Sequence, residues 1–172
     1  MIFLGPLRTE VRAAPWFAAL GAPLTEEIHA QARAYLGADA VLAVTSWRQA
    51  EDFLKSPETP LDWWDREETL RKRLLARAQK RYPRHALWRS LTELTTEAGE
   101  LVHASARAAA ARLDGAAAAS PHVAAGAASQ AVYQLAVARI AGCTTSPFES
   151  KFRLFASGRW PLGLRAGCLL LF

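Results

Sequence analysis

The sequence predicts a predominantly helical α+β fold, with a helix bundle or helical hairpin packed on a small β-sheet that includes the C-terminal strands. Three observations support this prediction. Most of the chain repeats apolar residues every three or four positions, a short β-branched run (VLAVT) interrupts that pattern, and the last residues form two apolar runs (WPLGL and CLLLF). The first pattern is typical of amphipathic helices, and short apolar runs bounded by turn residues are typical of strands.

We expect one domain that spans residues 1–172. A chain of 172 residues buries roughly 70% of the surface that its unfolded form exposes, so one core suffices without disulfides. Much of the apolar content is alanine, which buries little area. The six Trp, seven Phe and three Tyr residues are therefore expected to anchor a core of closely spaced helices.

The first forty residues predict an edge strand followed by a helix. Residues 2–4 (IFL) suit an edge strand, and residues 16–20 suit a short helix or an anchoring loop. Thr25 is a candidate cap for a helix that ends near residue 36 before Gly37, because a threonine oxygen accepts from the N–H groups of a first turn.

A strand and a capped helix follow. Residues 41–45 (VLAVT) are β-branched and predict a buried strand. Ser46 and Gln49 have the spacing of a capping box. The helix that they begin is expected to end before Pro57, because a residue that precedes proline disfavours helical geometry.

Two long helices are predicted next. The first begins at Asp62 or Asp65, carries many charges and is broken at Pro83. In the second, apolar positions recur in steps of four and three from His85 to about Leu113.

An alanine-rich helix is expected to begin at Ser120 and Pro121 and to end at Gly142. Its small residues match those of residues 104–111 in the preceding helix. We therefore expect the two helices to form a close antiparallel hairpin.

The tail changes period after residue 150. KFRLF alternates apolar with basic residues, and WPLGL and CLLLF have the form of two strands around a tight turn at RAG. CLLLF is apolar on both faces and so belongs in the middle of a covered sheet. We expect IFL, VLAVT and the two C-terminal strands to form this sheet, and truncation of the tail to destabilise the domain.

The cysteines and the first residues predict a cytoplasmic protein. Cys143 and Cys168 lack the spacing of a disulfide framework and are interpreted as reduced thiols. The opening MIFLGPLRTEV has no basic leader, and polar residues interrupt the longest uncharged run, so we expect neither a signal peptide nor membrane insertion. The alanine bias suggests a bacterial source.

Two Glu-x-x-His spacings are the candidate metal ligands. Residues three apart lie on one helix face, and di-iron or di-manganese bundles use such pairs with added carboxylates. The alternative is ordinary helix polarity, because acidic residues favour a first turn. The candidates are Glu26 with His29 and Glu100 with His103, with Glu97 as the added carboxylate.

A basic helix offers a candidate polyanion site. Residues 62–84 contain eight basic and four acidic residues and so carry most of the net charge of +5. On a helix, four of the basic residues form a stripe along one side, and such a stripe can bind phosphates or a partner protein. Its members are Arg66, Arg73, Arg77 and Lys80. The alternative is a solvated helix with i,i+4 ion pairs.

Polar residues in the alanine helices are candidates for a buried network or a pocket. Gln130, Tyr133 and Gln134 lie close together on one helix, and we expect His103 and Arg107 opposite them. Buried amides need hydrogen bonds, so such a network either fixes helix register or lines a pocket.

Tryptophans mark candidate interaction surfaces. In ASGRWPLG, Arg159 and Trp160 have the composition of an interface hot spot. The favoured alternative places Trp160 in the core and Arg159 at Glu149 or at a helix C-terminus. Trp63 and Trp64 are further candidates.

The sequence lacks a Gly-rich phosphate loop, a GxSxG motif and an HExxH motif, and it specifies no cofactor. We expect a non-catalytic accessory or assembly protein that acts by protein–protein contact, including contact with a second copy of the chain. The alternatives are an enzyme that uses a metal or a small ligand at the Glu-x-x-His pairs, and binding of nucleic acid or another polyanion by the basic helix.

Overall fold

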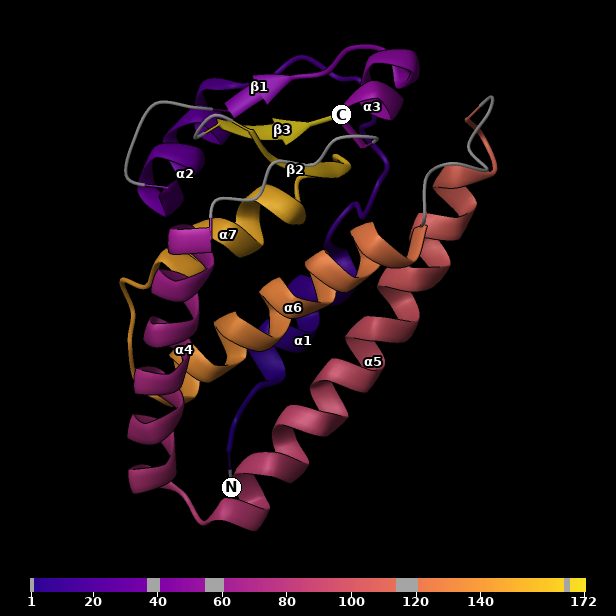
Figure 1. The fold of residues 1–172 in the computed structure, drawn as a ribbon. Helices are drawn as coiled ribbons and strands as arrows, with labels where there is room; N and C mark the ends of the chain where they lie inside the picture. The colour runs from indigo at the N-terminus through magenta and orange to yellow at the C-terminus, as the bar shows by residue number, and fades with distance from the viewer. Residues whose placement is uncertain (1, 37–40, 55–60, 114–120, 166–167) are drawn as a thin grey trace.

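A computed structural model describes residues 2–36, 41–54, 61–113, 121–165 and 168–172. The elements are α1 (Gly5–Ala13), α2 (Glu26–Leu36), β1 (Val41–Ala43), α3 (Trp47–Leu54), α4 (Leu61–Arg81), α5 (Arg84–Ala110), α6 (Pro121–Ile140), α7 (Pro147–Phe155), β2 (Pro161–Arg165) and β3 (Cys168–Leu171). Figure 1 shows a small sheet at one end of the molecule, with α2 and α3 beside it and the long helices α4, α5 and α6 below it. This is the expected helical α+β fold.

Helix α6 is the centre of the molecule, where it contacts α4, α5 and α7 (Figure 1). It is apolar around most of its circumference, which is the pattern of a buried helix. Gly142 stops it with φ of +69°, and the backbone N–H of Cys143 donates to Ala138 O at 2.9 Å. The predicted end of this helix is therefore confirmed.

Helices α5 and α6 form the predicted antiparallel hairpin, with small buried residues such as Ala98, Ala106 and Ala128 between them. The expected register is wrong, because the ring of His103 lies 5.5 Å from that of His122 rather than opposite the glutamines. A stripe of small residues presents the same surface at each turn, so spacing alone does not fix the register.

The described strands form one sheet in the order β1-β3-β2, with β3 parallel to β1 and antiparallel to β2. The predicted central position of CLLLF is confirmed. The strand predicted at residues 41–45 is shorter and lies at the edge, where Leu42 is 53% exposed although Val41 and Val44 are buried.

The strand predicted at Ile2–Leu4 is wrong, because these residues take no part in the sheet. They lead into α1, in which Gly5 and Pro6 occupy the first two helical positions. Proline is favoured there because its missing N–H has no partner in a first turn. Leu4 is buried at this helix start.

KFRLF belongs to α7 rather than to an alternating segment. Ser146 caps this helix by accepting from the Phe148 N–H at 3.2 Å, and Pro147 follows as its first residue. Phe148, Phe152 and Phe155 then share its buried face. The cap and the spacing of four and three outweigh the alternation.

Trp160 and Phe172 join the end of the chain to the core. Each residue donates its backbone N–H to the carbonyl of the other, at 2.6 and 2.9 Å. The Trp160 ring lies 5.2 Å from Phe17 and 5.9 Å from Trp47, and Trp47 also contacts Phe172. Trp160 and Phe172 are therefore both core residues.

None of the helices in the described part of the chain is both long enough and apolar enough to cross a bilayer.

Candidate functional site

The outward side of α4 carries cations that stay unpaired within the described residues. Arg71 and Lys72 contact Glu68 at 2.6 and 3.5 Å. Arg73, Arg77 and Lys80 are exposed and form no ion pair with the part of the chain described by the structure.

Two shallow clefts lie along these cations. One, of about 360 Å³, is lined by Asp65, Arg66, Thr69, Leu70 and Arg73. The other, of about 250 Å³, runs from Leu70, Arg73 and Arg77 to the segment that joins α6 to α7, where Cys143 and Pro147 line it. Leu70 therefore supplies an apolar side chain to both clefts.

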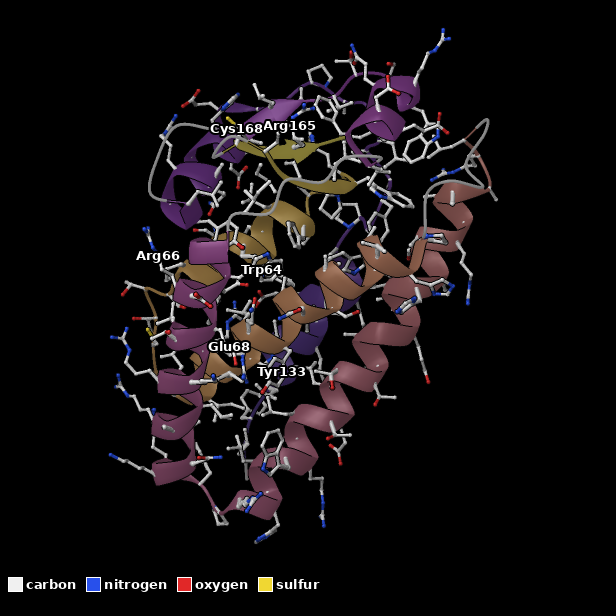
Figure 2. All side chains as sticks on the ribbon, in the orientation of Figure 1. Trp64, Arg66, Glu68, Tyr133, Arg165 and Cys168 are labelled. Carbon is white, nitrogen blue, oxygen red and sulfur yellow. The ribbon has the colours of Figure 1, made fainter. Side chains whose placement is uncertain are left out.

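Trp64 is 42% exposed near the start of α4. Figure 2 shows Arg66 on the outer side of this helix and Glu68 on the side toward Tyr133 of α6. Arg71 donates to the Tyr133 hydroxyl at 3.3 Å and links the two helices. The predicted contact residue Trp63 has a side chain outside the described part of the structure.

A buried polar cluster joins α2, α4 and α7. The Lys151 ammonium lies 2.5 Å from Glu67 Oε1, and the Tyr35 hydroxyl donates to that oxygen at 3.0 Å. Burial lowers the pKa of Lys151, and burial together with the negative charge of Glu67 raises that of Tyr35. A perturbed pKa can mark a functional site, but none of the described clefts includes these residues, so we interpret this cluster as a structural one.

Two of the candidate metal ligands, Glu97 and Glu26, form ion pairs with arginines. Glu97 accepts from Arg8 at 3.0 Å and from Arg12 at 2.6 Å, which joins α1 to α5. Glu26 pairs with Arg33 at 2.9 Å. Arginine beside a carboxylate occupies the oxygens that a metal would need.

The other candidate ligands lie on the same two helices. Glu100 is exposed on α5, and His29 is partly buried on α2. The His103 ring lies beside that of His122, tilted by 45°. The described residues contain no group of three or more His, Cys, Asp or Glu side chains that could hold a metal ion. The metal site stays a prediction.

The polar residues of α6 differ in their surroundings. Gln130 is exposed, whereas Tyr133 is partly buried beside Arg71. Gln134 is 1% exposed, and its Oε1 has no hydrogen-bond partner among the described residues. The predicted network therefore joins Tyr133 to α4 and leaves Gln134 outside it.

Arg159 and Trp160 are both buried, so the expectation of a partly exposed corner is wrong, and the favoured placement of Trp160 in the core is confirmed. The Arg159 guanidinium donates to Pro23 O and, at 3.5 Å, to Ser157 O just beyond α7. Glu149 pairs instead with Arg139 and Arg153.

Arg159 also lines a cleft of about 470 Å³ that the sequence does not predict. The cleft lies between α1, the start of α2 and α7, with Ala13, Thr25 and Phe152 among its walls. These residues are far apart in the chain, so only the packing of the helices brings them together. The single sequence signal is a basic residue placed directly before a core tryptophan.

No disulfide joins Cys143 to Cys168 in the structure, and the reduced state of these thiols stays a prediction.

Comparisons with protein-family models, with curated proteins and with solved structures find no match to this chain.

Proposed function

We propose that this protein is a non-catalytic accessory or assembly factor that binds an acidic partner protein through one side of α4. We call this surface the α4 face. It comprises Arg66, Leu70, Arg73, Arg77 and Lys80, whereas Trp64 lies on the other side of the helix, with Glu68 (Figure 2).

The observation that carries the proposal is the position of unpaired cations beside two clefts that an apolar residue also lines. Arg73 and Leu70 line both α4 clefts. Interface hot spots are enriched in arginine and lie in well-packed, desolvated surroundings. A partner that offers carboxylates around an apolar anchor would complement this surface.

One feature favours a protein over a nucleic acid. Asp65 lines the same cleft as Arg66 and Arg73. A carboxylate at this position repels a phosphate backbone, whereas a protein partner can place apolar groups over Leu70 and carboxylates over the arginines.

Polyanion binding is the second candidate function, because four cations repeat along one side of the helix at positions 66, 73, 77 and 80. Binding that rests on phosphate contacts weakens steeply as salt increases. A salt titration with a labelled oligonucleotide separates this candidate from the first.

The proposal is tested by photo-crosslinking in the natural host. A photoreactive residue replaces Thr69, which is exposed and lines a cleft beside the cations. We expect a crosslinked partner protein whose yield falls at least several-fold in the Arg73→Glu, Arg77→Glu variant. The matched control reverses two exposed arginines elsewhere, Arg48 and Arg89, and should leave the yield unchanged.

Three outcomes distinguish the alternatives. A crosslink that survives reversal of Arg73 and Arg77 excludes the α4 face as the binding surface. Recovery of a second copy of this chain, together with a dimer in light scattering, identifies the partner as the protein itself. Tight oligonucleotide binding that is lost in both high salt and the reversed variant favours the polyanion function.

A further inference from the structure

We propose that the cleft between α1, α2 and α7 binds a small organic acid, whose carboxylate is held by Arg159 and whose apolar body lies against Phe152 and Ile28. This site is separate from the α4 face.

The first observation is a buried cation without a counter-charge. Arg159 is 6% exposed, and it forms no ion pair within the described residues. Its only acceptors are the carbonyls of Pro23 and Ser157, and its Nε is buried with no partner in the described part of the chain. A buried charge without a partner is costly, so a bound anion would stabilise the protein.

The state of this side chain supports the same conclusion. Burial lowers the pKa of the Arg159 guanidinium. Arginine nevertheless stays charged in proteins. It has five N–H donors in a planar fork, and the carbonyls of Ser157 and Pro23 each accept from one of its two terminal nitrogens. The other donors of these nitrogens can bind a carboxylate.

The second observation is the helix start at the same cleft. Thr25 and Glu27 line the cleft at the beginning of α2. The N–H groups of a first turn lack acceptors within the helix and carry a partial positive charge. Thr25 Oγ1 accepts from the Ile28 N–H at 3.4 Å. The other N–H groups of this turn remain to bind the ligand's carboxylate together with the guanidinium.

The walls favour a monocarboxylate with an apolar body. Alanine, isoleucine and phenylalanine side chains line much of the cleft (Ala13, Ala14, Ile28, Phe152 and Ala156). The volume of about 470 Å³ lies within the roughly 300–1,000 Å³ of small-molecule sites.

The remaining charges argue against a phosphate. Arg153 lines the cleft but contacts Glu149 at 3.4 Å. Two further lining residues, Glu10 and Glu27, are acidic, and Glu10 pairs with Arg139 at 2.7 Å. With one uncommitted guanidinium and two carboxylates nearby, a single negative charge suits the cleft better than two.

The test measures binding of hexanoate, leucine and inorganic phosphate to the full chain by calorimetry and by thermal unfolding. We expect hexanoate to bind and to raise the melting temperature in a concentration-dependent way. Phosphate should bind on the order of tenfold more weakly or not at all. Leucine distinguishes a plain carboxylate site from one in which Glu27 also holds an ammonium group.

Two variants locate the binding. Arg159→Gln should weaken hexanoate binding by roughly tenfold or more, because a charge-assisted hydrogen bond is lost. Arg159 also holds two backbone carbonyls, so Ala13→Trp serves as a second variant that fills the cleft from an exposed position on α1. Ala30→Trp, on an exposed position of α2 that does not line the cleft, is its control.

Hexanoate or leucine binding that both cleft variants abolish, and that Ala30→Trp retains, supports the proposal. Three results overturn it: failure of all three probes to bind, tighter binding of phosphate than of either carboxylate, or hexanoate binding that Ala13→Trp leaves intact.

Discussion

Lys151 and Glu67 form an ion pair in which both side chains are almost completely buried, at 3% and 7% of their full exposure. The pair joins α7 to α4 across 84 residues of sequence. Tyr35 adds α2 to the same cluster, and the Lys151 ammonium lies over the rings of Tyr35 and Phe155. These contacts satisfy charges that would otherwise be costly to bury.

Removing one member of this pair should destabilise the fold. Glu67→Gln leaves the Lys151 ammonium buried without its counter-charge, and we expect a loss of about 3–5 kcal/mol. Loss of the Lys151 proton in the variant would remove the buried charge and so limits this cost. Burial already lowers the pKa of Lys151, which makes that loss easier. Urea unfolding monitored by tryptophan fluorescence gives the change.

The neighbouring residue supplies the control. Glu68 forms a half-exposed pair with Arg71 that lowers the pKa of this carboxyl to about 2. Glu68→Gln should cost less than about 1 kcal/mol, because exposed pairs are screened by water. Equal losses for the two variants would contradict a special role for the buried pair.

Tyr35 predicts a loss of stability at alkaline pH. Its hydroxyl is buried and donates to Glu67, so its pKa in the folded protein is raised above the ordinary value. Above about pH 10 the unfolded chain releases this proton while the folded chain keeps it. The folded state then binds more protons, so its stability falls as pH rises.

The measurement compares the protein with its Tyr35→Phe variant between pH 8 and pH 11. Lys151 acts in the opposite direction, since its lowered pKa makes stability rise with pH, but it is common to both proteins. We expect the stability difference to fall by up to about 1.4 kcal/mol per pH unit above pH 10. A constant difference would show that Tyr35 ionises equally in both states.

The local elements were predictable from the sequence, because each has its own signals. Thr25 and Ser46 cap helices as expected, and the tail forms two strands with CLLLF in the centre. KFRLF shows the limit of this approach. Its alternation over five residues was misleading, because Ser146 and Pro147 begin a helix before it.

The candidate sites were less predictable, because they depend on long-range packing. The sequence identified the basic stripe, which lies on one helix. It did not identify the cleft at Arg159, whose walls come from α1, α2 and α7, because α7 follows α2 by more than a hundred residues. Nor does helical spacing reveal that Glu97 faces two arginines of α1.

Gln134 predicts a stabilising substitution. Its side chain is 1% exposed in the centre of α6, and Oε1 has no partner among the described residues. A buried polar atom without a partner costs about 1–3 kcal/mol. Gln134→Leu has nearly the same volume, and we expect it to raise the free energy of unfolding by about 1 kcal/mol.

Thermal and urea unfolding test this substitution against Gln130→Leu, which changes an exposed position one turn earlier on the same helix. The control should alter stability by less than about 0.5 kcal/mol. A loss of stability in Gln134→Leu would show that the amide makes a hydrogen bond that the protein needs.

The C-terminal strand should unfold together with the helices. Leu171 is 1% exposed on β3, between Ala43 of β1 and Pro161 of β2. Leu171→Ala should cost about 2–5 kcal/mol, because it leaves a cavity in the core. Leu42→Ala, at a 53% exposed position on the edge strand, should cost less than about 1 kcal/mol.

Urea unfolding followed by helical circular dichroism and by tryptophan fluorescence should give coincident transitions for Leu171→Ala, because Trp160 and Phe172 connect β3 to the core. If the fluorescence transition moves to lower urea while the helical signal does not, the sheet unfolds separately and the tail is not part of one cooperative core.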